Sequence, residues 1–141
     1  MHEMPTSRWR RAALVDLAAV VLFVVIGRAS HRHAETAAGI ASTGWPFLAG
    51  LGTGWAVVGA LGRRRGTPAN PSSFADPSSL ASGAAICAAT VASGMALRVV
   101  AGQGTAPSFV GVATGFLGTL MLAGRAALRA GRRGRHGTAQ P

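Results

Sequence analysis

Residues 44–55 of this chain read GWPFLAGLGTGW, and this stretch decides the fold because it is apolar yet carries four glycines, a proline and two tryptophans. Glycine and proline weaken helices in water, but both are more frequent in membrane-spanning helices. The whole chain of 141 residues is 49% hydrophobic and only 13% charged, with a mean hydropathy of +0.34. It is too apolar for a typical soluble domain, so we expect an integral membrane protein.

Four apolar stretches have the length needed to cross a hydrocarbon core of about 30 Å. In lipid they must be helices, because backbone donors and acceptors have to be satisfied within each segment. The sequence therefore predicts an all-α, four-helix transmembrane bundle with spans at about 12–29, 44–62, 80–101 and 106–124. We expect a membrane domain over 12–128, a basic N-terminus at 1–11, a linker at 63–79 and a basic disordered tail at 129–141.

The arginines indicate the orientation of the bundle. If the four spans alternate in direction, eleven arginines fall on one side and three on the other, which are Arg28, Arg32 and Arg98. Positive charge accumulates on the cytoplasmic side of membrane proteins. We therefore expect both termini and the 63–79 linker in the cytoplasm, with the protein in the inner cell membrane.

A cleaved signal peptide is the alternative interpretation of residues 7–30, which read SRWRRAALVDLAAVVLFVVIGRAS. Basic residues precede an apolar stretch, and Ala29 lies near a potential cleavage point. Asp16 interrupts the apolar stretch, however, and Arg28 is an unfavourable neighbour for cleavage. We favour a retained first helix.

Two glycine pairs with the spacing G-x-x-x-G occur in the second and fourth predicted helices, at Gly50 and Gly54 and at Gly111 and Gly115. Small residues let membrane helices approach closely, which is the main route to association in lipid. We predict that these four glycines are helix-packing positions and that the second and fourth helices meet through them.

The same two regions resemble each other as an internal repeat. WPFLAGLGTGW at 45–55 and APSFVGVATGF at 106–116 share the pattern P-x-x-x-G-x-x-T-G-aromatic without a gap. Each proline is expected in the first turn of its helix, where its missing N–H costs little. The chain is then two helical hairpins in the same orientation, as in parallel-repeat transporters. The alternative is coincidence in a sequence rich in small residues.

Asp16 is the only acidic residue inside a predicted span, which makes it a candidate functional residue. Its predicted depth is about one turn from the cytoplasmic surface, similar to that of Arg125, whereas Arg98 lies near the opposite face. An ion pair with Arg125 is geometrically feasible and one with Arg98 is not. We favour a structural or snorkelling carboxylate over a functional one because the predicted depth is shallow.

A second polar group gathers at the expected outer side. GRASHRH and the turn after the third span bring together Arg28, His31, Arg32, His33, Arg98 and Gln103. Such a pocket could bind an anion or a lipid headgroup, or respond to pH through histidine. A hydrated loop with anchoring arginines is the interpretation we favour.

Other kinds of chemistry lack support in the sequence. Cys87 is the only cysteine, the histidine pair is a poor metal-ligand set, and no predicted span contains histidine for haem. No catalytic triad, paired carboxylates or Cys–His cluster is visible. AGQGTAPSF is expected to form a tight turn, because it lacks the strand and the lysine of a phosphate loop. We expect no enzyme activity, no cofactor and no metal.

The basic segments are expected to contact lipid. Arg63, Arg64, Arg65 and the C-terminal tail suit anionic lipid headgroups, which attract each arginine near the surface by about 1 kcal/mol. Topology and lipid already account for this charge, so nucleic-acid binding is not expected.

Three ordered motifs resemble a known family. They are D-x(11)-G-R-x-S-H from Asp16 to His31, WPFLxGxxxGW at 45–55 and LRxxxGQGTAxSF at 97–109. Together they resemble the actinobacterial Domain of Unknown Function family 3054 over about residues 12–128. The resemblance implies a short integral membrane protein of four helices with no established activity, and it draws attention to Arg28, His31 and Arg98.

Two functional hypotheses follow. The first is a small inner-membrane protein with a structural or accessory role in a membrane assembly, with homo-oligomerisation as one form of that role. The second is a small transporter or channel that uses Asp16 and the outer Arg28, His31 and Arg98 cluster.

Overall fold

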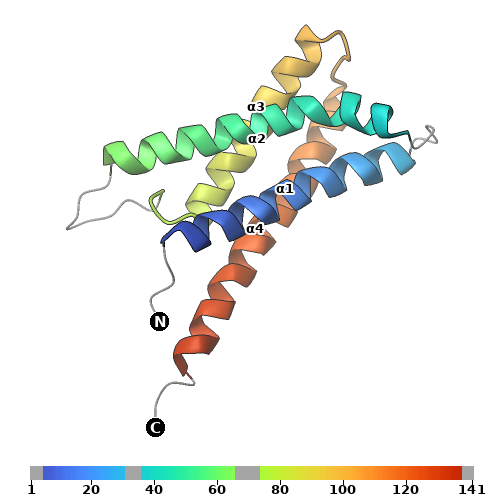
Figure 1. Cartoon of the computed structure of the whole chain (residues 1–141). Helices are drawn as coiled ribbons and strands as arrows, with labels where there is room; N and C mark the ends of the chain where they lie inside the picture. The colour runs from blue at the N-terminus through green and yellow to red at the C-terminus, as the bar shows by residue number, and fades with distance from the viewer. Residues whose placement is uncertain (1–4, 31–35, 66–73, 138–141) are drawn as a thin grey trace.

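The computed structural model describes residues 5–30, 36–65 and 74–137. They form α1 (Pro5–Ser30), α2 (Ala37–Arg65), α3 (Leu80–Val100) and α4 (Pro107–Gly137), as Figure 1 shows. Each helix contains a stretch that is long and apolar enough to cross a membrane. The predicted all-α bundle of four transmembrane helices is confirmed, and the described residues contain no strand.

The four helices form a ring in chain order. α1 contacts α2 and α4, and α3 contacts the same two helices from the other side, so α1 lies diagonally opposite α3. The start of α1, the end of α2, the start of α3 and the end of α4 lie on the same side of the molecule in Figure 1. This is the alternating arrangement that the arginine distribution requires.

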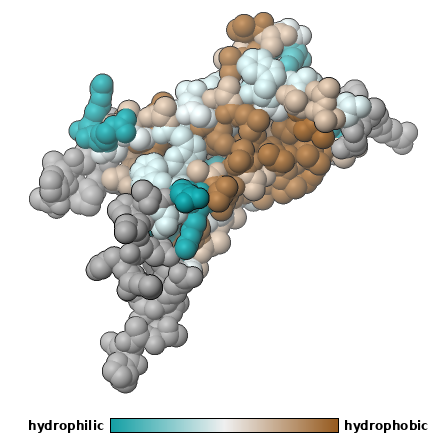
Figure 2. Space-filling model, viewed as in Figure 1, coloured by the Kyte–Doolittle hydropathy of each residue, from teal (hydrophilic) through white to brown (hydrophobic). Residues whose placement is uncertain are grey.

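All four helices contribute apolar side chains to one core. The buried cluster consists of Ala19, Val20, Phe23, Val24, Phe47, Leu51, Val58, Ile86, Cys87, Val91, Met95, Ala113, Leu117 and Met121. Other large apolar side chains, such as Leu22 and Val112, are exposed. Figure 2 shows a broad hydrophobic surface over the second half of α1 and hydrophilic side chains where α1 begins and α2 ends. An apolar exterior with charged ends suits a lipid environment.

The closest helix contact is between α2 and α3, and glycine makes it. A Cβ atom added at Gly50 would lie 2.6 Å from the Thr90 carbonyl oxygen, and one at Gly54 would lie 2.9 Å from that of Ile86. Both distances are shorter than real contacts, so only glycine fits at this approach of two backbones. The first G-x-x-x-G pair is therefore a helix-packing site, but its partner is α3.

The predicted contact between the second and fourth helices is wrong. α2 and α4 occupy opposite corners of the ring and make no close backbone approach among the described residues. Gly111 and Gly115 are exposed, and a Cβ at either would meet no atom within 4 Å. A G-x-x-x-G pair marks a face that permits close approach, but it does not specify the partner helix.

The two hairpins run in the same direction, but their equivalent interfaces differ. α2 packs much more closely on α3 than α4 packs on α1. The prolines differ as well, since Pro107 is the first residue of α4 whereas Pro46 lies inside α2. The expectation of a first-turn proline at Pro46 is wrong, because Thr36 caps the helix upstream and accepts a hydrogen bond from the Gly39 N–H at 3.1 Å. A true internal repeat remains a prediction.

The remaining boundaries follow local signals. Ser79 caps α3 by accepting from the Ser82 N–H at 3.0 Å. Gly102 and Gly104 both have a φ of +69°, so the GQGTA segment is the expected tight turn. α4 continues to Gly137, so residues 129–137 are helical where a disordered tail was predicted; four of these nine residues are arginine, a good helix former.

Candidate functional site

Asp16 and Arg125 form a buried ion pair between α1 and α4. Arg125 donates to both carboxylate oxygens, from Nη1 to Oδ1 at 2.5 Å and from Nη2 to Oδ2 at 2.8 Å. Both side chains are 0% exposed. The pair that the sequence allowed is present, whereas a carboxylate that snorkels to the interface is not.

The ion pair is enclosed by α2 and α3. A Cβ at Gly83 would lie 2.9 Å from Arg125 Cγ, so the absence of a side chain at this glycine leaves space for the aliphatic part of the Arg125 side chain. The Trp55 ring centroid lies 6.0 Å from the guanidinium carbon, and Trp9 contacts Trp55 edge-on at 5.4 Å between centroids. Asp16 and Arg125 thus neutralise each other's charge inside the bundle and connect α1 to α4. We call this ion pair the Asp16–Arg125 clamp.

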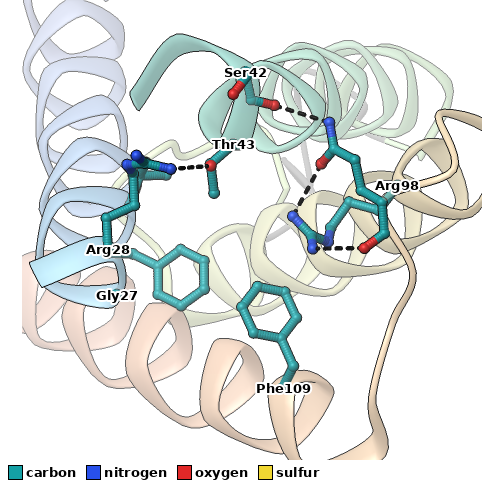
Figure 3. Close-up of a pocket in the computed structure, with 9 residues that line it drawn as sticks. Gly27, Arg28, Ser42, Thr43, Arg98 and Phe109 are labelled. Atoms are coloured by element: carbon teal, nitrogen blue, oxygen red, sulfur yellow. Dashed lines mark hydrogen bonds between the residues drawn. The ribbon is translucent and has the colours of Figure 1, made fainter. Parts of the chain in front are cut away.

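A cavity of about 650 Å³ opens at the other end of the bundle, where α1 ends and α2 begins. We call it the outer vestibule because the arginine distribution predicts that this end faces outward. Its lining residues come from all four helices and the α3–α4 turn: Phe23, Val24, Gly27, Arg28, Ser42, Thr43, Arg98, Gln103 and Phe109. Figure 3 shows Arg28 and Arg98 on opposite sides of this space.

Hydrogen bonds hold both vestibule arginines in place. Arg28 donates from Nη1 to the Thr43 hydroxyl at 3.1 Å. Arg98 donates to the side-chain oxygen of Gln103 at 3.0 Å, to its carbonyl at 3.4 Å, and to the Gly104 carbonyl at 3.3 Å. Its guanidinium carbon also lies 4.6 Å from the Phe109 ring centroid, within cation–π range.

Gln103 connects Arg98 to α2. Its side-chain amide donates to the Ser42 carbonyl at 2.9 Å. In a regular helix that carbonyl would accept from the N–H of residue 46, but this residue is Pro46, which has none. The internal proline of GWPFLAGLGTGW therefore leaves an acceptor that Gln103 uses.

Aromatic side chains close the vestibule toward the core. Phe23 contacts Phe47 at 5.2 Å, Phe116 at 5.8 Å and Phe109 at 5.9 Å between ring centroids. Phe23 and Phe47 are almost fully buried. We call these four residues the phenylalanine layer, and they separate the vestibule from the ion pair.

The structure brings together part of the predicted outer cluster. Arg28, Arg98 and Gln103 line one cavity, whereas His31, Arg32 and His33 lie outside the described residues. Asp16 belongs to the opposite end of the bundle. Sequence reasoning missed Ser42 and Thr43, although Pro46 is a signal for Ser42 because it removes the N–H four residues downstream.

No metal site emerges in the described ranges, where no three side chains of His, Cys, Asp or Glu gather in one place. Cys87 is buried in the core with a free thiol. Within the described residues, the ion pair and the vestibule are therefore the two candidate sites.

A comparison with models of protein families gives a match. Searches of curated proteins and of solved structures found none that matches this chain. A family model described as a protein of unknown function, DUF3054, matches residues 13–128, which include α2, α3 and most of α1 and α4. The chain belongs to the DUF3054 family, a family of proteins of unknown function.

Proposed function

We propose that this protein is a non-catalytic structural or accessory subunit of a membrane assembly. In this proposal it lies in the inner cell membrane with both termini in the cytoplasm, as the arginine distribution favours. Arg63 and Arg64 are exposed at the cytoplasmic end of α2, where they and Arg65 would meet anionic lipid headgroups. No nucleic-acid partner and no cofactor are proposed.

The observation that carries this proposal is the exposure of α4. Only 17% of its most apolar stretch is buried, compared with 33–39% for the other three helices. Gly111 and Gly115 lie on this uncovered helix, and side chains there would meet open space. In lipid such a face permits close approach of another helix, from a second copy or from a different protein.

The interior of the bundle supports a role without conduction. The phenylalanine layer and the apolar core lie between the vestibule and the buried ion pair. A bundle whose interior is filled with apolar side chains offers no continuous polar path, and it is suited to binding other proteins of a membrane assembly through its outer surface. Its rigidity would come from the Asp16–Arg125 clamp and the glycine contact between α2 and α3.

Crosslinking in the native membrane, followed by mass spectrometry, tests the accessory role. We expect a discrete partner, or a second copy, in stoichiometric amounts, with crosslinks that map to α4. If the protein is recovered only as a monomer at crosslinker doses that capture known complexes of the same membrane, the accessory role is wrong.

A transporter or channel is the second candidate, and one observation favours it. The vestibule with Arg28 and Arg98 and the buried ion pair lie at opposite ends of the same bundle. This function predicts an anion or solute flux in proteoliposomes that Asp16→Asn and Arg98→Ala both abolish. Vesicles that stay tight with the wild-type protein favour the accessory role.

A further inference from the structure

Arg125 and Arg98 differ in how their charge is balanced. Arg125 pairs with Asp16, which is the only acid within the four apolar spans. Arg98 has no carboxylate partner within the part of the chain that the structure describes, because its three hydrogen bonds end on neutral oxygens. A guanidinium carries five N–H donors, so two of those on Arg98 remain for a ligand.

Arg28 brings a second guanidinium to the same cavity. It approaches from α1, and Arg98 approaches from α3, as Figure 3 shows. None of the described residues that line the vestibule is acidic. Two guanidinium groups that face one cavity make its potential more positive, and this arrangement favours an anionic ligand.

The paired N–H donors of two guanidinium groups suit phosphate better than other anions. Guanidinium forms paired hydrogen bonds to phosphate and carboxylate oxygens, and phosphate offers enough oxygens to meet two guanidinium groups at once. The Thr43 hydroxyl, already held beside Arg28, is a further polar group at this position.

Much of the remaining lining of the vestibule is apolar. Phe23, Val24 and Phe109 form much of its lining, and its volume of about 650 Å³ lies in the range of sites for drug-sized ligands. A bare inorganic ion would leave most of this space unfilled. An apolar group attached to the phosphate would cover the phenylalanine side chains.

We propose that the outer vestibule binds a phosphate group, held between Arg28 and Arg98, with an attached apolar group on Phe23 and Phe109. Gln103 is a positioning residue in this site, because it holds Arg98 and is itself held by the Ser42 carbonyl. The source of the phosphate is a lipid headgroup or a free phosphate compound. The site is independent of the accessory role, since it needs no protein partner.

The test uses the full chain in detergent and three probes. Dioctanoyl phosphatidic acid carries the phosphate on a lipid, dioctanoylglycerol has the same chains without it, and inorganic phosphate has no chains. Native mass spectrometry measures the lipids, and calorimetry measures inorganic phosphate. The variants are Arg98→Gln, Arg28→Gln and Arg98→Lys, with Arg63→Gln as the matched control at the opposite end.

We expect the phosphatidic acid to bind and the diacylglycerol not to bind. Arg98→Gln and Arg28→Gln should each weaken binding of the phosphatidic acid at least about tenfold. Arg98→Lys should retain part of the binding, because lysine keeps the positive charge. Arg63→Gln should leave the binding unchanged. Arginine-dependent binding of inorganic phosphate as strong as that of the lipid would identify a free phosphate as the source and would contradict the proposed contact of an apolar group with Phe23 and Phe109. Equal binding by all variants, or no binding of either phosphate probe, would overturn the proposal. Thermal unfolding of each variant shows whether it is folded.

Discussion

Asp16 and Arg125 lie 109 positions apart in the chain and are joined by two hydrogen bonds of 2.5 and 2.8 Å, with both side chains fully buried. This pair ties the first helix to the last and closes the ring of four. An isolated charge at this position would be costly, because both side chains are fully buried and a buried ion needs an opposite charge beside it.

Removing one member of the pair should therefore destabilise the protein more than removing both. Asp16→Leu or Arg125→Met alone is expected to lower the free energy of unfolding by about 3–5 kcal/mol, and the double variant by much less. Thermal unfolding in detergent, followed by circular dichroism, measures this. Arg129→Met, at an exposed position one turn along α4, is the control. If the losses of the single variants simply add in the double variant, the pair is not a clamp.

The two glycine pairs should respond differently to the same substitution. Gly50→Ala is expected to destabilise the protein by about 1–3 kcal/mol, because the new Cβ would press on the Thr90 carbonyl and separate α2 from α3. Gly111→Ala meets open space and should be neutral or stabilising by up to about 1 kcal/mol through helix propensity. Unfolding measurements on both variants decide the matter, and equal effects would contradict the observed packing.

Gln103 and Pro46 should be energetically coupled. Gln103→Ala removes the donor to the Ser42 carbonyl, whereas Pro46→Ala supplies a backbone N–H to the same acceptor. Gln103→Ala should therefore cost less in the Pro46→Ala background than in the wild type, with a coupling energy of about 0.5 kcal/mol or more. A double-mutant cycle of unfolding free energies measures it. Strict additivity would mean that Gln103 does not replace the missing N–H.

The orientation can be tested with single cysteines in a Cys87→Ser background. Ala106→Cys at the α3–α4 turn and Ala130→Cys near the end of α4 are both at exposed positions on opposite ends of the bundle. A membrane-impermeant maleimide added to intact cells should label Ala106→Cys and spare Ala130→Cys until the membrane is permeabilised. The reverse pattern would invert the orientation that the arginines predict.

Much of the fold could be predicted from the sequence, because the length and apolar character of a span are local properties. The four helices and the feasibility of the Asp16–Arg125 pair follow from counting residues along such spans. The partner of Gly50 and Gly54 could not be predicted, since a small-residue face is equally open to any neighbour. The start of α2 was also missed, because an N-cap at Thr36 competes with the stronger signal of Pro46.

The candidate site was predictable only in part, for a similar reason. Arg28, Arg98 and Gln103 are polar residues near the same predicted surface, so their proximity follows from topology. The contribution of Thr43 and the enclosure of Arg125 by Gly83 and Trp55 depend on which helices are neighbours. That information arises from the packing of the whole ring and is absent from any single segment.

The accessory role depends most directly on what covers α4 in the native membrane. A photo-crosslinking amino acid at Val112, which is 61% exposed on α4, should give one discrete protein adduct, whereas the same group at Leu22, which is 45% exposed on α1, should react with lipid alone. Mass spectrometry of the adducts identifies the partner as a second copy or a different protein. If Val112 and Leu22 both give only lipid adducts, α4 faces the bilayer and the proposed role in a membrane assembly is wrong.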